Sequence, residues 1–164
     1  MEMKDKVMLA MIEYFKGDAK RIQHFTKVHS YAALIGKMEG LSEQQQNVLE
    51  LAALVHDIGI KKAEEKYGKN TGKLQEQEGP TEAKKLLLSL GVEKQAVERI
   101  CYLVGHHHTY KDIDALDYQI LVEADFLVTL YEDNEEKAVA KVVYQTIYKT
   151  KSGKKILEEM YGLS

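Results

Sequence analysis

Apolar residues recur along this chain at spacings of three and four, and this period limits the chain to helical folds. Such spacing gathers apolar side chains on one face of an α-helix, whereas the alternating pattern typical of half-buried strands is absent. The sequence therefore predicts an all-α protein. We expect helices near residues 3–16, 19–39, 43–57, 80–90, 93–106, 115–131, 135–149 and 152–161.

Local signals mark several ends of these helices. Ser42 followed by Gln45 has the spacing of a capping box. Pro80 suits the first position of a helix, where its missing N–H breaks no hydrogen bond. The charged, glycine-containing segment 61–79 therefore predicts a long surface loop, with room for one helical turn, of a length that often serves as a lid.

The totals are those of a globular protein. With 164 residues, 45% of them hydrophobic, the chain fits one domain with a substantial core, and we expect residues 1–164 to form it. A net charge of -3 and the lack of a basic stripe argue against a nucleic-acid duplex as partner. No apolar run approaches the ~18 residues of a membrane span, so we expect a cytoplasmic protein without a membrane partner.

One nearly apolar helix ends in a polar pair. Residues 50–55 lead directly into His56 and Asp57. A helix that is apolar all round belongs in a core, so this pair is expected to be buried. Burial of two titratable groups is costly unless they bind each other, other polar groups or a metal ion. The alternative is an aspartate that caps a turn beside a surface histidine.

A carboxylate interrupts a second apolar helix. Asp125 shares a helical face with Leu121 and Val128, whereas Glu123 projects elsewhere and is expected at the surface. A metal ion or an arginine would satisfy a buried Asp125, and hydrogen bonds to backbone or tyrosine are the alternative.

The helix near 19–39 carries two histidines. His24 lies on a face with apolar residues, and His29 lies roughly 140° away at ~100° per residue. The two imidazoles are therefore not expected to reach one centre. A lone histidine on an apolar face is also compatible with an ordinary core position.

These three segments, residues 21–28, 51–59 and 123–125, together resemble the metal-dependent HD phosphohydrolase superfamily, named for its adjacent His-Asp pair. The resemblance runs from about Arg21 to Glu132. It implies a helical HD domain with a motif-bearing core at about 19–132, on which C-terminal helices 135–161 pack. It also implies a divalent transition metal, Mn²⁺, Fe²⁺, Co²⁺, Ni²⁺ or Zn²⁺, with one ion expected and two open. The implied ligands are His24, His56, Asp57 and Asp125.

Three consecutive histidines, His106, His107 and His108, close another apolar helix. In HD proteins with two metals, including the HD-GYP phosphodiesterases, a His-His pair follows a similar helix and a further histidine lies upstream. Glu78 stands at the place that looks comparable here. The resemblance thus implies a second site from Glu78, His106 and His107, bridged by Asp57. Donation to a substrate phosphate and a polar helix end are alternatives.

HD-GYP proteins carry a lysine directly after His-Asp-Ile-Gly, where this chain has Ile60, and the GYP segment is absent. Cleavage of cyclic dinucleotides is therefore not assigned. Lys61, the next residue, is a candidate phosphate contact, with a solvated surface position as the alternative.

The resemblance implies hydrolysis of a phosphoester, in a nucleotide or another small phosphorylated metabolite, by metal-activated water. Asp57, His106 and Lys61 are the expected catalytic residues. One alternative is a di-iron oxygenase similar to myo-inositol oxygenase, and another is a metal- or nucleotide-binding sensor without turnover. A homo-oligomer also stays open.

Overall fold

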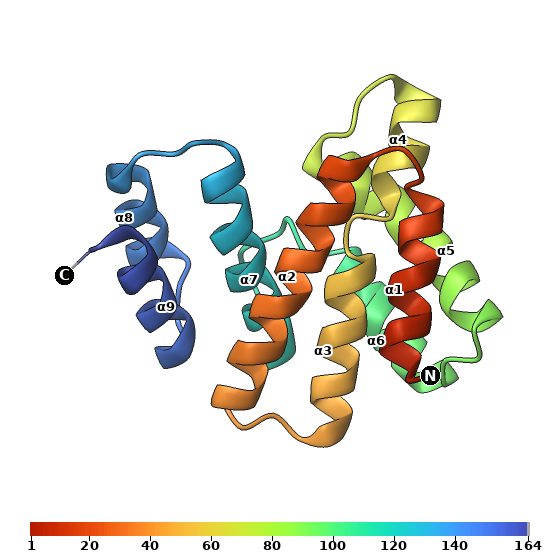
Figure 1. The fold of residues 1–164 in the computed structure, drawn as a ribbon, viewed down its shortest axis with the longest axis horizontal. Helices are drawn as coiled ribbons and strands as arrows, with labels where there is room; N and C mark the ends of the chain where they lie inside the picture. Colours follow the sequence, from red (N-terminus) through yellow and green to blue (C-terminus); the bar gives the residue numbers. More distant parts are fainter. Residues whose placement is uncertain (164) are drawn as a thin grey trace.

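The computed structural model describes residues 1–163, and over that range it contains nine helices and no strand (Figure 1). The prediction of an all-α fold is confirmed. None of these helices combines the length and the apolarity that a membrane crossing requires. The helices are α1 (Met3–Tyr14), α2 (Ala19–Met38), α3 (Glu43–Val55), α4 (Gly59–Tyr67), α5 (Gly72–Ser89), α6 (Lys94–Val104), α7 (Leu116–Glu132), α8 (Lys137–Thr146) and α9 (Lys151–Tyr161).

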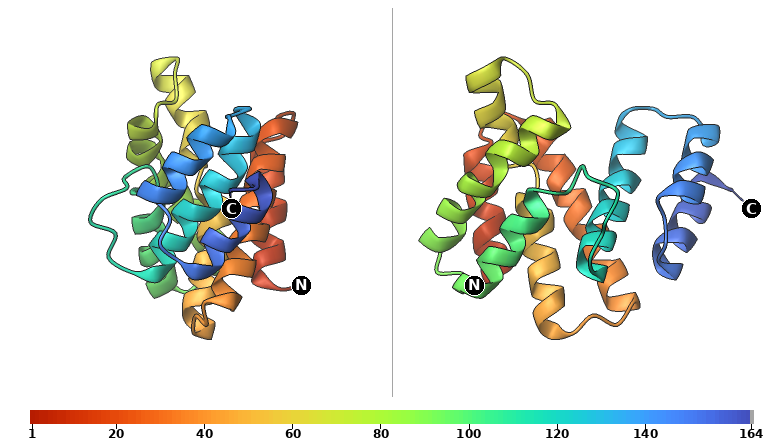
Figure 2. Two further views of the ribbon diagram at one scale, coloured as in Figure 1. Left: turned by 90° about the vertical axis from the view of Figure 1, so that its left-hand side faces the viewer. Right: turned by 180° about the vertical axis from the view of Figure 1, so that it is seen from behind.

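Helices α2, α3 and α7 form the centre of the molecule. Helix α2 packs against both α3 and α7, and α3 also contacts α1 and α6. The side chains at 51–55 of α3 are fully buried, as its apolar sequence predicts. Figures 1 and 2 show α8 and α9 at the opposite end of the molecule from α1, α4 and α5, with α9 packed on α7 and α2. The capping box at Ser42 is present at the start of α3.

The loop predicted for 61–79 is wrong, because α4 and the first half of α5 occupy this segment. Gly68, with φ of 70°, ends α4, and the Thr71 side chain caps α5 by accepting a hydrogen bond from the backbone N–H of Leu74. Pro80 consequently lies inside α5 and not at its start.

The glycines in this region serve contact between helices. A Cβ added to Gly59 would lie 2.7 Å from the backbone nitrogen of Gly79, so α4 and α5 touch backbone to backbone. A Cβ on Gly79 would lie 2.6 Å from Val104 of α6. Close packing therefore explains glycines whose presence in the sequence favours a loop.

Glu123 is the second residue whose position differs from the prediction, because its side chain is expected at the surface but is fully buried. Its carboxylate accepts hydrogen bonds from the Gln119 amide, the backbone N–H groups of Lys149 and Thr150, and the Thr150 hydroxyl. A Cβ on Gly153 would overlap this carboxylate. Glu123 thus joins α7 to the first turn of α9, and these hydrogen bonds offset the cost of its burial.

Candidate metal centre

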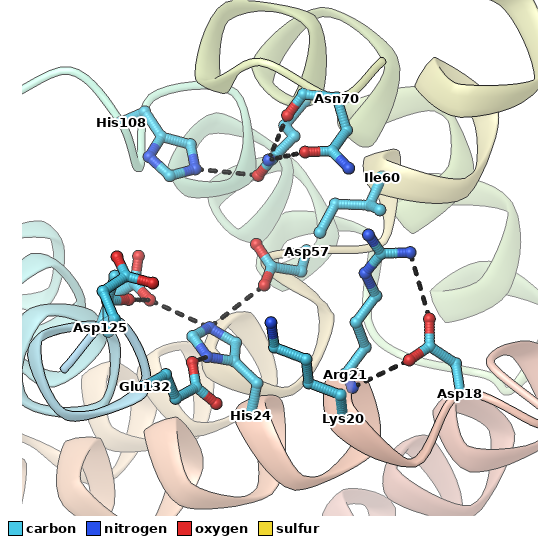
Figure 3. A pocket seen from close by; sticks show the side chains of 13 residues that line it. Asp18, Lys20, Arg21, His24, Asp57, Ile60, Asn70, His108, Asp125 and Glu132 are labelled. Atoms are coloured by element: carbon cyan, nitrogen blue, oxygen red, sulfur yellow. Dashed lines mark hydrogen bonds and ion pairs between the residues drawn. The ribbon is translucent and has the colours of Figure 1, made fainter. Parts of the chain in front are cut away.

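Four polar side chains from three parts of the chain meet in the core. His24 projects from α2, Asp125 from α7, and His56 and Asp57 follow the end of α3 (Figure 3 shows all but His56). The His24 Nε2 atom lies 3.2 Å from His56 Nε2 and from Asp57 Oδ2, and 3.1 Å from Asp125 Oδ1. The His56 Nε2 atom lies 3.4 Å from Asp57 Oδ2 and 3.6 Å from Asp125 Oδ1. The apolar helices thus bring all four residues together.

Hydrogen bonds orient both imidazoles toward this cluster. His24 Nδ1 lies 2.7 Å from Glu132 Oε1, and His56 Nδ1 lies 2.7 Å from the carbonyl oxygen of Ala53. Both acceptors require a proton on Nδ1, which leaves the lone pair of the neutral ring on Nε2. Two lone pairs then face each other at 3.2 Å between two carboxylates. Such an arrangement needs a cation, either a proton or a metal ion, and it has the donor set of a divalent transition metal site.

The carboxylates also govern the protonation of the cluster. Burial alone would lower the pKa of His24, but hydrogen bonds to Asp125 and Asp57 outweigh it and raise this pKa to about 11. Burial would raise the pKa of Asp125, yet the hydrogen bonds to His24 and His56 hold it below its usual value. A metal ion at this position therefore competes with a proton.

A second group of potential ligand atoms adjoins the first. Asp57, His107 and His108 each offer one atom, and these atoms lie within 4.8 Å of one another. His107 is fully buried, and its Nε2 lies 3.5 Å from Asp57 Oδ1. His108 Nε2 lies 2.9 Å from Gln75 Oε1.

Three residues expected in the site lie outside it. His106 stacks on Tyr102 at 4.0 Å between ring centroids, and its Nδ1 lies 2.7 Å from the Tyr102 carbonyl oxygen. Lys61 donates to the carbonyl oxygen of Tyr14 and lies over the Tyr14 ring. Glu78 pairs with the Lys66 ammonium group at 2.6 Å.

The physical reasons for these misplacements differ. Helix α6 ends at Val104, so the three histidines lie in a turn to which helical angles do not apply, and the turn directs His107 and His108 inward. Lys61 lies on the exposed side of α4, and α5 directs Gln75 toward His108 while Glu78 faces α4. His29, expected to lie away from the centre, bonds to Glu50.

Glu132, Gln75 and Lys20 were not predicted from the sequence as site residues. Glu132 lies seven residues after Asp125, about two helical turns along the same face, and this spacing could have identified it. Gln75 lies in the segment 61–79, for which the sequence predicts a loop and therefore no inward-facing helical side. Lys20 precedes the motif and carries no signal beyond its charge.

A cavity of about 530 Å³ opens onto the cluster (Figure 3). Lys20 lies exposed at this cavity and, within residues 1–163, makes no ion pair, while Arg21 pairs with Asp18 and Glu64. Ile60 is the one apolar residue of the lining. The lining residues are Asp18, Lys20, Arg21, His24, Asp57, Ile60, Asn70, Gln75, His108, Asp125, Thr129, Glu132 and Asp133.

Comparison with known proteins gives a family match and a similar solved structure. The model of the HD domain family matches residues 21–148, which include all four clustered side chains. The fold is similar to the 1.45 Å crystal structure of a predicted HD superfamily hydrolase from an uncultured Thermotogales bacterium. The TM-score is 0.70 at 25% sequence identity, and the match covers 97% of this chain and 85% of that one. No curated protein matches this chain.

Proposed function

Since this chain belongs to the HD domain family, we propose that it is a metal-dependent phosphohydrolase acting on a nucleotide or another small phosphorylated metabolite. The observation that carries the proposal is the convergence of His24, His56, Asp57 and Asp125, with both imidazole Nδ1 atoms already engaged. These four residues would hold one ion of Mn²⁺, Fe²⁺, Co²⁺, Ni²⁺ or Zn²⁺.

An ion bound there supplies Lewis acidity, which makes water a nucleophile near neutral pH and withdraws charge from phosphoryl oxygens. Side chains of the protein itself orient the metal ligands and offset the negative charge of the substrate phosphate. Glu132 holds the His24 ring in its tautomer, and the Lys20 ammonium group offers a charge to the phosphate at the entrance of the cavity. Lys20 thus takes the part for which Lys61 was expected.

The cavity supports a small polar substrate. Its volume of about 530 Å³ lies within the usual range for small-molecule sites, and all of its lining residues except Ile60 are polar or charged. Asn70 and Thr129 also line the cavity, where the Asn70 amide nitrogen donates to Glu64 and the Thr129 hydroxyl donates to Asp125.

The test is release of inorganic phosphate from a panel of nucleoside monophosphates, other nucleotides and small phosphoesters. Metal-free protein is loaded separately with each of the five ions. Turnover of at least one substrate is expected, and it should disappear in a His56→Ala Asp57→Ala variant. His29→Ala is the matched control, because His29 pairs with Glu50 away from the cavity. Turnover no greater than that of the double variant, for every substrate and ion, would refute the proposal. Tight substrate binding without product would instead indicate a sensor.

A further inference from the structure

His107 has a buried nitrogen with no partner. Its Nδ1 lies 2.7 Å from the carbonyl oxygen of Val104, so a neutral ring carries its lone pair on Nε2. Among the described residues this Nε2 has no hydrogen-bond partner, and it lies 3.5 Å from Asp57 Oδ1. A lone pair facing a carboxylate in a core is unfavourable unless a cation lies between them.

Gln75 directs an oxygen to His108, whose ring lies beside His107 and Asp57. Its amide nitrogen donates to the carbonyl oxygen of Asn70 at 2.7 Å, which fixes which end of the amide points inward. The remaining atom, Oε1, therefore faces His108 Nε2 at 2.9 Å. Two ligands at ~2.1 Å from one ion and at right angles lie about 3.0 Å apart, so this spacing is compatible with a shared ion as well as with a hydrogen bond.

The backbone around Gln75 is closely held. A Cβ added to Gly59 would lie 2.6 Å from the Gln75 carbonyl oxygen, and one added to Gly72 would lie 3.0 Å from His108 Cγ. The Glu76 carboxylate accepts a hydrogen bond from the backbone N–H of His108 at 3.0 Å. Contacts within the chain therefore fix the start of α5 and the histidine turn relative to each other.

We propose that the Gln75 amide oxygen is a ligand to a second divalent cation, held together with Asp57, His107 and His108. This inference rests on the proposed function, in which Asp57 already binds the first ion. The first metal position has two carboxylate ligands. The second metal position has only the Asp57 carboxylate, which it shares with the first, and adds the neutral amide oxygen of Gln75. The second ion is consequently the more weakly bound of the two and the first to be lost on dilution.

The experiment titrates metal-free protein with Mn²⁺ alone and measures bound ion by equilibrium dialysis with elemental analysis. Electron paramagnetic resonance detects coupling between neighbouring ions. The wild-type chain should bind two ions with affinities at least about tenfold apart, and the second should produce spin coupling through Asp57. Gln75→Ala should lower the affinity for the second ion by a further factor of roughly ten or more and leave the affinity for the first ion unchanged. Gln75→Glu should raise the affinity for the second ion, because it replaces a neutral ligand oxygen by a charged one.

Gln77→Ala is the matched control. Gln77 is exposed on the same helix and bonds to Tyr67, so its loss should change neither affinity. Circular dichroism of each metal-free variant reports folding, and the opposite effects expected of alanine and glutamate at Gln75 are not those of a purely structural role.

A single ion at saturating Mn²⁺, or equal second-ion affinities in Gln75→Ala and Gln77→Ala, would overturn this inference and leave the proposed function intact. Two bound ions of unequal affinity without hydrolysis of any phosphoester would instead overturn the proposed function alone.

Discussion

Replacement of Glu132 tests what orients the His24 ring at the first metal position. Its carboxylate accepts a hydrogen bond from His24 Nδ1 at 2.7 Å, and only 17% of its side chain is exposed. This short bond between charged or polarised groups holds the His24 ring with Nε2 directed at the other ligands. Loss of such an outer partner lowers metal affinity by roughly 10- to 100-fold, or about 1.4–2.7 kcal/mol.

Glu132→Gln keeps an acceptor oxygen but removes the charge, so its metal affinity should fall by a factor near the lower figure of this range. Glu132→Ala removes the acceptor as well, so its metal affinity should fall by a factor near the upper figure. The assay is titration of metal-free protein with Co²⁺, followed by visible absorption, which reports the ligand environment of the tight ion. Glu135→Gln is the control, since Glu135 is exposed and lies just beyond the same helix. Wild-type Co²⁺ affinity in folded Glu132→Ala would refute the view that Glu132 orients His24.

Three further results are expected. Glu123→Ala should lower the free energy of unfolding by about 3 kcal/mol in urea titrations, because several buried donors lose their acceptor; a change below about 0.5 kcal/mol would contradict this. Lys20→Ala should lower kcat/KM for the identified substrate by roughly tenfold, while Lys61→Ala leaves kcat/KM unchanged. A loss of kcat/KM in Lys61→Ala but not in Lys20→Ala would instead identify Lys61 as the phosphate contact. Because the pKa of His24 in the metal-free protein is raised to about 11, the His24 ring is protonated at neutral pH, and an ion must displace that proton. Metal affinity should therefore rise with pH by about tenfold per unit, with release of about one proton seen by calorimetry in two buffers, and a pH-independent affinity would contradict the competition.

The sequence was sufficient to predict that His24, His56, Asp57 and Asp125 would meet. His24 and Asp125 interrupt apolar helical faces, and His56 and Asp57 directly follow a fully buried helix, so all four side chains adjoin the all-α core. Periodicity alone left an alternative open for each residue, and the resemblance to the HD superfamily selected the set of four.

The surroundings of the cluster could not be predicted in the same way. Glycines at 59 and 79 indicate a loop when only local propensity is considered, yet here they permit backbone contact between α4 and α5. This tertiary contact decides that Gln75 and not Glu78 faces His108. The end of α6 at Val104 likewise decides which histidines turn inward. Both depend on where a helix ends, which local sequence predicts least well.

His24, His56, Asp57 and Asp125 are proposed to bind one divalent ion. The most direct test of this proposal is anomalous diffraction from crystals of the protein loaded with Mn²⁺. We predict a strong anomalous peak about 2.1–2.3 Å from His24 Nε2, His56 Nε2 and one oxygen of each carboxylate. The absence of a peak among these four side chains at saturating Mn²⁺ would contradict the account.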